Sequence, residues 1–488
     1  MTTINNEVTV GHESLADSDD VNAVVARLRS TFATGRTRSY AWRKSQLIAL
    51  DRLMTENWPA IAKAIEQDVR RHPMETSIAD YYTVIGDIAH ARRHLRSWMS
   101  RKRVGGLPLE HRPASAWTEP EPYGTVLIIG PWNFPIALTL DPLVAALAAG
   151  NTVILKPSEL APSSSALMAE LVPKYLDSDS IAVIEGDGAI TQELISCGLD
   201  KLFFTGGTEV GRKILAGAAP HLTPAALELG GKSPVYVSSD ANLETAAKRI
   251  AYTKRYNAGQ ICIAPDYILA EQSIRDELVR LIGEAWRLFD PVKRSLLPIV
   301  NQRQFDRLSN ILSSTKAEVV FGGQVDRNTL SIEPTIVLDP ELDDPVMNQE
   351  LFGPILPVLS VTGEQQAIEI INSQPKPLTC YIFTKSSARA KAFISAVPSG
   401  SAAVNQLLFQ FTCPTLPFGG VGESGIGAYH GKAGFEEFSH RKSVFQRRAW
   451  WDLAFIFPPY DSSKISLLRG IMDAKYRLIR FRLRLFRK

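Results

Sequence analysis

The stretch 125–156, TVLIIGPWNFPIALTLDPLVAALAAGNTVILK, decides the fold class. It opens with an apolar run over residues 125–129 that stops at Gly130-Pro131, and it continues through residues 139–149 to Gly150. A short apolar run stopped by Gly-Pro is typical of a buried strand, whereas a longer apolar segment closed by Gly is typical of a helix. Residues 152–155 are a second apolar run, so the stretch predicts a strand, a helix and a strand. Such a unit is characteristic of a parallel sheet.

The same alternation extends in both directions along the chain. Residues 181–184 and 201–204 are further strand candidates followed by helical sequence, and residues 21–100 carry apolar positions at helical spacing. A second alternating region runs from Pro234 to about residue 410. We therefore predict an α/β fold with two doubly wound, Rossmann-like lobes and a small bridging or oligomerisation segment. Ligands are expected between the lobes, at the carboxyl ends of the strands.

The composition is ordinary for a soluble globular protein. The chain has 488 residues, 22% charged and 45% hydrophobic, which suggests about three domains at roughly 150 residues each. The four cysteines are too scattered for a disulfide framework or a zinc knuckle, so a reducing, cytoplasmic setting is expected. The first residues lack the basic and apolar regions of a signal peptide, and no apolar run approaches the ~18 residues of a membrane span.

The net charge of +3 conceals a basic C-terminal tail. Residues 461–488 hold nine Lys and Arg against two Asp, a balance of +7, which leaves −4 for the rest of the chain. The body therefore gives no sign of nucleic-acid binding. On a helical wheel, one face of the tail is apolar: Ile465, Leu467, Leu468, Ile471, Met472, Leu478, Ile479, Leu483, Leu485 and Phe486. The opposite face is charged: Arg469, Asp473, Arg477, Arg480, Arg484 and Arg487, with only Lys475 and Arg482 out of place.

Two interpretations of this tail have equal weight. In the first, the tail forms a helix that lies on the inner face of an anionic membrane. In the second, the helix packs on the protein body or across an oligomer interface. Pro458-Pro459 separates the tail, residues 458–488, from the preceding chain.

Glycines follow one predicted strand at a position suited to an anion. The turn contains Gly206, Gly207, Thr208, Glu209, Val210 and Gly211. A strand-to-helix turn of this kind exposes backbone N–H groups to a dinucleotide phosphate. The spacing G-G-x-x-x-G differs from the G-x-G-x-x-G fingerprint, so a tight turn without a ligand is at least as well supported by this motif alone.

Three polar side chains have unusual surroundings. Glu228 stands among apolar residues before Gly-Gly; if it is buried, its pKa is raised and it suits a general base, and the alternative is a solvent-facing Glu on an edge strand. Cys262 lies in an irregular loop, where a catalytic thiol would be accessible and partly ionised, although most free cysteines are inert packing residues. Asn133, between Trp and Phe, offers an amide to an oxyanion or to its own turn. We expect no metal site, because the histidines lack ligand spacing.

Together these motifs resemble the aldehyde dehydrogenase superfamily. The matching segments, in chain order, are PWNFP at 131–135, KPSE at 156–159, LELGGKSP at 227–234, GQICIAPDY at 259–267, ELFGP at 350–354 and LPFGGVG at 416–422. The segment 429–440 looks like the class 3 branch, which handles fatty and aromatic aldehydes. The resemblance covers about residues 20–445.

The resemblance implies a role for each matching residue. Cys262 would attack the aldehyde, Asn133 and the Cys262 N–H would hold the oxyanion, and Glu228 would activate water to release the acid. The implied cofactor is NAD, with NADP as an alternative, because a carboxylate at Glu159 repels a 2′-phosphate. The residues implied to bind the cofactor are Lys156, Glu159, Gly206 to Gly211, Glu350 and Phe352. Without the resemblance, Lys156 and Glu350 would be taken for surface charges and Phe352 for a core aromatic.

The resemblance also implies an organisation and a function. Residues 1–100 and 122–229 would bind NAD(P), residues 230–413 would form the catalytic domain, and residues 101–121 and 414–457 would bridge subunits in a homo-oligomer, with a dimer favoured. The expected substrate is a small apolar aldehyde, with a medium or long chain or an aromatic group, which is oxidised to a carboxylic acid through a thiohemiacetal and a thioester on Cys262. Ile261 and Phe134 depart from the common Thr and Tyr, which affects substrate preference more than chemistry. The alternatives are a cofactor-independent thiol esterase and a catalytically idle, membrane-associated binding protein.

Overall fold

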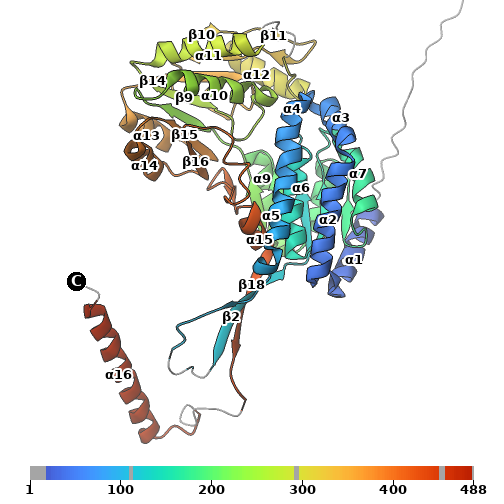
Figure 1. Cartoon of the computed structure of the whole chain (residues 1–488), viewed down its shortest axis with the longest axis vertical. Helices are drawn as coiled ribbons and strands as arrows, with labels where there is room; N and C mark the ends of the chain where they lie inside the picture. The colour runs from blue at the N-terminus through green and yellow to red at the C-terminus, as the bar shows by residue number, and fades with distance from the viewer. Residues whose placement is uncertain (1–17, 109–110, 112–113, 291–295, 450–456, 486–488) are drawn as a thin grey trace, which may run out of the picture. The chain divides into compact units, whose positions relative to one another are not determined.

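The computed structural model describes residues 18–108, 111, 114–290, 296–449 and 457–485 of the chain. The chain divides into two compact units: residues 1–100 with 120–441, and residues 101–119 with 442–488. The first unit contains two large sheets with their helices, and both are drawn in Figure 1. The predicted α/β class with parallel sheets is confirmed.

The first sheet has six strands in the order β17-β7-β6-β3-β4-β5. Its five parallel strands are β3 (Thr125–Ile129), β4 (Thr152–Lys156), β5 (Ile181–Val183), β6 (Lys201–Thr205) and β7 (Ala225–Glu228); β17 (Gly425–Ile426) pairs antiparallel with β7. The predicted strand, helix and strand at 125–156 are all present, because α6 (Ala137–Ala149) joins β3 to β4. Gly150 ends this helix at φ 89°, a left-handed conformation that favours glycine.

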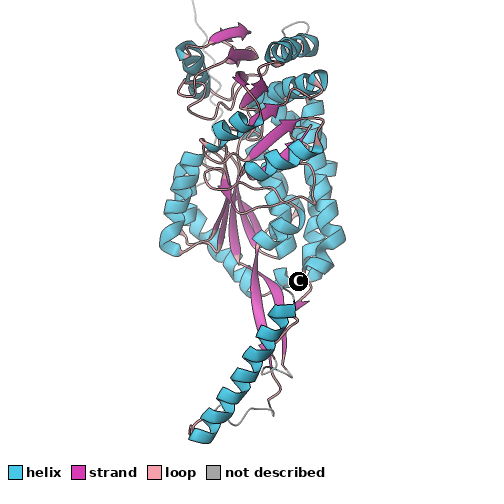
Figure 2. Ribbon diagram, turned by 90° about the vertical axis from the view of Figure 1, so that its left-hand side faces the viewer, coloured by secondary structure: helices cyan, strands magenta, loops and turns pink. Residues whose placement is uncertain are grey.

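Both faces of this sheet are buried, which explains its continuous apolar strands. Val126 and Ile128 face a core shared with α2 (Tyr40–Glu56), α5 (Tyr82–Trp98), α6 and α7 (Pro162–Tyr175). Leu127 and Ile129 face the opposite core, which α1 (Ser18–Ala33), α8 (Gly188–Ser196) and α9 (Thr208–Ala218) complete. The helices therefore cover the sheet from both sides, as Figure 2 shows.

The second sheet has seven strands in the order β10-β13-β14-β9-β8-β15-β16. Its strands are β8 (Pro234–Val237), β9 (Tyr267–Glu271), β10 (Glu318–Phe321), β13 (Thr335–Leu338), β14 (Ile355–Val361), β15 (Thr379–Phe383) and β16 (Ser401–Val404). Only β10 pairs antiparallel with its neighbour in this sheet. One face packs on α10 (Leu243–Arg255) and α11 (Arg275–Phe289), and the other on α12 (Gln302–Ser314), α13 (Glu364–Asn372) and α14 (Ser387–Ala396).

The remaining elements of the first unit are η1 (Arg36–Arg38), α3 (Trp58–Val69), α4 (Pro73–Thr76), η2 (Ser77–Tyr81), η4 (Ala219–His221), η5 (Tyr256–Gly259), β11 (Val325–Asp326), β12 (Ser331–Ile332) and α15 (Gly431–Glu437). The second unit contains β1 (Lys102–Arg103), most of β2 (Ser115–Pro122) and of β18 (Ser439–Gln446), and α16 (Ser462–Leu485). β1, β2 and β18 form a three-stranded sheet in that order. Among the residues that the structure describes, no helix combines the length and the apolar character that crossing a membrane requires.

Candidate active site

Four of the predicted site segments lie at one edge of the six-stranded sheet. Asn133 follows β3, Lys156 ends β4, Gly206 follows β6 and Glu228 ends β7. These strands are parallel neighbours, so their carboxyl ends meet at one edge. The strand order reverses between β3 and β6, the topological switch point at which open α/β sheets bind ligands.

The seven-stranded sheet contributes from its opposite edge. Cys262 precedes β9 and Glu350 precedes β14, so both lie at the amino ends of parallel strands. The predicted site residues therefore lie at the carboxyl ends of strands in the first sheet and at the amino ends of strands in the second. The reason is that the Cys262 loop comes before its strand in the chain, whereas the site segments of the first sheet end or follow their strands.

A run of left-handed backbone shapes the loop before Cys262. Asn257, Ala258 and Gly259 have φ values of 48°, 54° and 70°, a conformation that is costly for residues with a Cβ. A side chain at Gly259 would collide with the carbonyl oxygen of Gly353, so glycine is required there. The loop is thus held close to the segment that carries Glu350.

The Cys262 thiol is half-buried. Burial raises its pKa, and the nearby carboxyl groups of Glu350 and Glu228 raise it further; the N–H groups of Cys262 and Ile263 act in the opposite direction. Burial and the two carboxyl groups therefore oppose ionisation of this thiol in the chain alone. No histidine in the described part of the chain hydrogen-bonds this sulfur; His430, for example, pairs with Asp87 at 2.9 Å.

Asn133 is held rigidly beside the Cys262 loop. Its Nδ2 donates to the carbonyl of Gln260 at 3.0 Å, and its own carbonyl accepts from Arg71 at 3.0 Å. Arg71 forms a fully buried ion pair with Asp80 and lies over the Phe134 ring. An amide nitrogen carries two hydrogens, so one is left to donate to a ligand. The alternative, in which Asn133 only bonds its own turn, is wrong, because its partner is 127 residues away in sequence.

Glu228 is a buried carboxyl group without a hydrogen-bond partner. It is 3% exposed, and neither of its oxygens is bonded. Burial raises its pKa well above the ordinary value, and the charge of Glu437 raises it further. The predicted raised pKa is confirmed, and the solvent-facing alternative is wrong because β7 lies between β6 and β17. A carboxylate with a raised pKa is a stronger base than a free one.

The residues proposed for the cofactor differ in their exposure. Lys156 is buried and its ammonium lies 3.0 Å from the half-exposed carboxylate of Glu159. Glu350 is half-buried, and burial raises its pKa to about 8, so neither Lys156 nor Glu350 is a simple surface charge. The Phe352 ring meets the Trp132 ring edge-on at 5.7 Å, and its φ of 48° strains the backbone.

The glycine turn leads directly into α9. Gly207 precedes this helix, no side chain caps it, and the space beside its Cα is open. The first N–H groups of the helix are therefore placed to bind an anion. Glu209 and Val210 project outward instead, and Glu209 pairs with Arg212.

An apolar cavity of about 110 Å³ opens next to the Cys262 thiol. Besides Cys262 it is lined mainly by apolar side chains: Ile78, Ala79, Phe134, Ala137, Leu138, Tyr252, Tyr256, Ile261, Ile263, Leu408, Phe409 and Phe411. Phe134 and Ile261, the two departures noted in the sequence, are both part of this wall. Thr83 and Thr412 also contribute.

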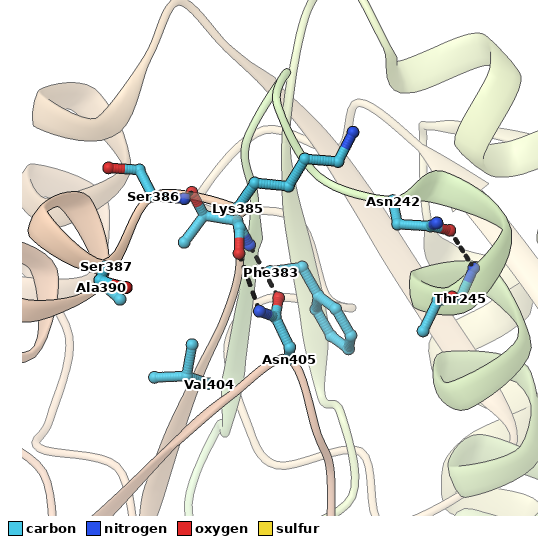
Figure 3. A pocket seen from close by; sticks show the side chains of 10 residues that line it. Asn242, Thr245, Phe383, Lys385, Ser386, Ser387, Ala390, Val404 and Asn405 are labelled. Atoms are coloured by element: carbon cyan, nitrogen blue, oxygen red, sulfur yellow. Dashed lines mark hydrogen bonds between the residues drawn. The ribbon is translucent and has the colours of Figure 1, made fainter.

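A second hollow of about 270 Å³ lies at the carboxyl ends of β8, β15 and β16. Asn242, Lys385 and Asn405 line it, and the Asn405 amide bonds the backbone of Thr384 in both directions, as Figure 3 shows. It is therefore at the sheet edge opposite Cys262. Within the described residues, no cluster of three or more His, Cys, Asp or Glu side chains could hold a metal ion.

Sequence reasoning missed the residues that support the site from a distance. Arg71 and Asp80 fix Asn133, and Trp132 contacts Phe352. No local pattern marks Arg71, because its partner at Asn133 is 62 residues away.

The fold and the site together define a class of protein. Two parallel α/β sheets bring a dinucleotide-type crevice, a thiol and an unpaired carboxyl group together, as in cofactor-dependent oxidoreductases that act through a covalent thiol adduct. Comparison with known proteins makes the assignment specific. A model of the aldehyde dehydrogenase family matches residues 3–444, and the chain belongs to this family.

Individual relatives agree with the family model. Aldehyde dehydrogenase family 3 member F1 of Arabidopsis thaliana is 42% identical over 475 residues, which are 95% of this chain and 98% of that protein. The dimeric NADP-preferring aldehyde dehydrogenase of Mus musculus is 40% identical over 432 residues, 88% of this chain and 95% of that protein. The solved substrate-bound state of Staphylococcus aureus AldH has a TM-score of 0.88 at 36% identity, covering 93% of this chain and 99% of that chain.

The resemblance to class 3 members is thereby confirmed, and the chain is an NAD(P)-dependent aldehyde dehydrogenase, an oxidoreductase acting on the aldehyde group. The thiol esterase and the idle binding protein are not supported by these similarities.

Proposed function

We propose that this enzyme oxidises apolar aldehydes to carboxylic acids through a covalent adduct on Cys262. The observation that carries the proposal is the apolar cavity, which ends at the Cys262 thiol. An alkyl or aromatic group placed there leaves water, while its aldehyde carbon meets the sulfur. Medium- or long-chain and aromatic aldehydes fit this lining better than polar ones.

The nucleophile and the oxyanion donors come from neighbouring segments. Cys262 attacks the carbonyl carbon and forms a thiohemiacetal, and its proton passes to a base. The second amide hydrogen of Asn133 and the Cys262 N–H hold the oxygen as it gains charge. Each such donor contributes about 3 kcal/mol to transition-state stabilisation in comparable sites.

The residues at the sheet edge fit a dinucleotide. The uncapped α9 N-terminus at Gly207 suits a phosphate, Lys156 and Glu159 suit one ribose, and Glu350 with Phe352 suits the nicotinamide end. Bound NAD(P)⁺ would accept the aldehyde hydrogen with its two electrons, and loss of that hydride from the thiohemiacetal leaves a thioester on Cys262. A half-exposed carboxylate at Glu159 repels a 2′-phosphate, so we favour NAD over NADP.

Glu228 completes the cycle by acting on water. Its raised pKa makes its carboxylate a strong acceptor for a water proton, and the resulting nucleophile hydrolyses the thioester on Cys262. Both oxygens of Glu228 are unbonded in the structure, so no internal partner competes for that water. The carboxylic acid then leaves and the thiol is restored.

The organisation proposed for this activity follows the sequence prediction. Residues 1–100 and 122–229 bind NAD(P), and residues 230–413 carry the nucleophile. Residues 101–121 and 414–457 bridge two subunits of a homodimer. Support for a dimer is the similarity to a mouse enzyme described as dimeric.

For the tail we propose contact with an anionic membrane from the cytoplasmic side. In α16 the apolar residues Leu467, Leu468 and Ile471 are 43–51% exposed, and the same helix carries Arg469, Arg477 and Arg480. Helices with an apolar and a basic face lie in the surface of anionic bilayers. The other interpretation, packing on the body or across an oligomer interface, is decided by experiment.

The reaction is tested with NAD and a medium-chain aldehyde. Cys262→Ala should abolish formation of reduced cofactor, whereas Cys197→Ala, which alters another half-buried cysteine, should retain activity. Oxidation at the normal rate by Cys262→Ala would refute the mechanism. Ester hydrolysis without cofactor and without aldehyde oxidation would favour a hydrolase instead.

The tail is tested by removing residues 458–488. The full chain should bind phosphatidylserine-containing vesicles, less so in high salt, and the truncated chain should not. Equal binding by the truncated chain would exclude the membrane role. Loss of the dimer without any vesicle binding would favour the oligomer-interface interpretation.

A further inference from the structure

A buried ion pair joins the three segments of the site. The Lys232 ammonium donates to Asp266 Oδ2, to the carbonyl of Val346 at 3.1 Å and to the carbonyl of Gln349 at 3.0 Å. The side chains of the pair are only 9% and 4% exposed. An ammonium group has three N–H donors, so Lys232 uses all of them here. Its chain position, four residues after Glu228, ties the Glu228 strand to this cluster.

Asp266 extends the connection to the two other segments. Its Oδ1 accepts from the N–H of Leu351 at 2.8 Å, and its backbone N–H donates to the carbonyl of Ser233 at 2.8 Å. Asp266 lies four residues after Cys262, and Leu351 directly follows Glu350. One carboxylate therefore fixes the Cys262 loop and the Glu350 loop against each other.

Glu350 is confined from the other sides as well. Its carboxylate occupies the place where a Cβ at Gly230 would stand, and the Gly231 N–H faces it. Arg307 donates to the carbonyl of Glu350 at 3.2 Å and to that of Leu351 at 2.6 Å. The Glu350 side chain thus fits only because Gly230 lacks a Cβ, and the Lys232–Asp266 ion pair holds the backbone next to Glu350 in place.

We propose that the Lys232–Asp266 ion pair is the positioning element of the site, which sets both the place and the charge of Glu350 opposite the cofactor. The inference rests on the proposed role of Glu350 in binding the nicotinamide end of NAD(P). Neither Lys232 nor Asp266 contacts the reacting atoms; both act through Glu350 and the loop that carries it.

The electrostatics of the cluster give the pair opposite effects on Glu350. Burial first, and then the Asp266 charge, raise the pKa of Glu350 to about 8; the Gly231 N–H, Lys232 and Arg307 act against this rise. Glu350 in turn raises the pKa of Cys262, and it raises the pKa of Lys254 and of Arg307 against the lowering effect of burial. Asp266 therefore favours the protonated form of Glu350, and Lys232 favours the carboxylate.

Because Asp266 and Lys232 shift the pKa of Glu350 in opposite directions, an effect on its charge can be distinguished from a purely structural effect. An ionised carboxylate accepts stronger hydrogen bonds than a neutral one, so affinity for NAD⁺ should rise with pH through the Glu350 pKa. Asp266→Asn keeps an oxygen for the Leu351 N–H and removes the negative charge. It should lower the midpoint of that rise by on the order of one pH unit, a tenfold change in proton affinity. Adding Lys232→Met in the same chain should move the midpoint back up.

The measurement is calorimetric titration of the full chain with NAD⁺ between mild acid and mild base, without aldehyde. Glu350→Gln should flatten the pH dependence and thereby assign the midpoint to Glu350. Lys232→Arg retains the charge but cannot reproduce the three bonds of an ammonium, so it should weaken binding several-fold without moving the midpoint. Thermal unfolding of each variant shows whether it is folded. If Asp266→Asn is unstable, the binding measurement on Lys232→Arg still tests whether the ion pair positions Glu350.

Each outcome bears on a different statement. If Glu350→Gln leaves the pH dependence intact, the proposed role of Glu350 fails. If it flattens the dependence but Asp266→Asn and the double variant shift the midpoint in the same direction or not at all, the ion pair does not set the charge of Glu350. If Lys232→Arg binds NAD⁺ as tightly as the unaltered chain, the ion pair does not set the position of Glu350.

Discussion

Filling the apolar cavity should change which aldehydes the enzyme prefers without changing its chemistry. Ala137 is 1% exposed, lines the cavity beside Cys262 and stands in α6, where Leu is also a good helix former. Ala137→Leu adds three carbon groups to the wall. The three added carbon groups project into the cavity of about 110 Å³ and take up space that a substrate chain would otherwise fill.

The expected magnitude follows from the transfer of methylene groups out of water. Each buried methylene contributes about 0.8 kcal/mol. For the unaltered enzyme, kcat/KM should therefore rise about fourfold for each carbon added to the aldehyde, as long as that carbon still enters the cavity. Displacing about three methylenes costs about 2.4 kcal/mol, or about 60-fold in kcat/KM for hexanal. Acetaldehyde, which needs little of this space, should be affected only slightly.

The assay is the absorbance of reduced cofactor across a series of straight-chain aldehydes from two to ten carbons. A matched control is Phe409→Ala, because Phe409 lines the same cavity but is 54% exposed at its rim. That variant should spare the short aldehydes and weaken only the long ones. If Ala137→Leu lowers kcat/KM by one common factor for all aldehydes, or leaves the ratio of kcat/KM for hexanal to that for acetaldehyde unchanged, this cavity is not the substrate site.

Two further predictions concern stability. The raised pKa of Glu350 means that the folded chain holds a proton that the unfolded chain has lost, so the free energy of unfolding should fall by about 1.4 kcal/mol per pH unit as pH rises from 4.5 towards about 8. Glu350→Gln should reduce the slope in urea titrations, to which the buried Glu228 carboxyl still contributes, and the exposed control Glu341→Gln should retain it in full; equal slopes in both would contradict the assignment. Arg71→Met leaves Asp80 buried without its partner, so it should cost about 3–5 kcal/mol of stability and lower kcat through Asn133, whereas Arg52→Met on the surface should change neither. A fully stable Arg71→Met chain would show that the buried pair is dispensable.

Local patterns predicted the secondary structure closely. The strand at residues 125–129 has the predicted bounds, and the helix closed by Gly150 begins two residues earlier than expected, at Ala137. Apolar runs ended by Gly or Pro report on burial and on chain direction, both of which are properties of neighbouring residues. The same patterns could not show at which edge of the second sheet Cys262 would lie.

The candidate residues were found by sequence, but their states were not. Glu228 was singled out by its apolar neighbours, and its raised pKa follows from burial that only the surrounding sheet provides. A catalytic thiol must be partly ionised to act as a nucleophile, and the burial and carboxyl groups around Cys262 raise its pKa. Ionisation depends on every charge and solvent-excluding group within several ångströms, whatever its distance along the chain.

The sequence by itself determined the parallel α/β architecture, the order of the motifs and the basic amphipathic character of residues 461–488. Periodicity and motif spacing carry this information because they involve residues that are close in the chain. Only the tertiary structure decided that Lys232 and Asp266 join three segments, that Arg71 supports Asn133, and that apolar residues from distant segments enclose a cavity at Cys262. These contacts depend on how elements pack, since the backbone of each partner is positioned by a different strand or helix.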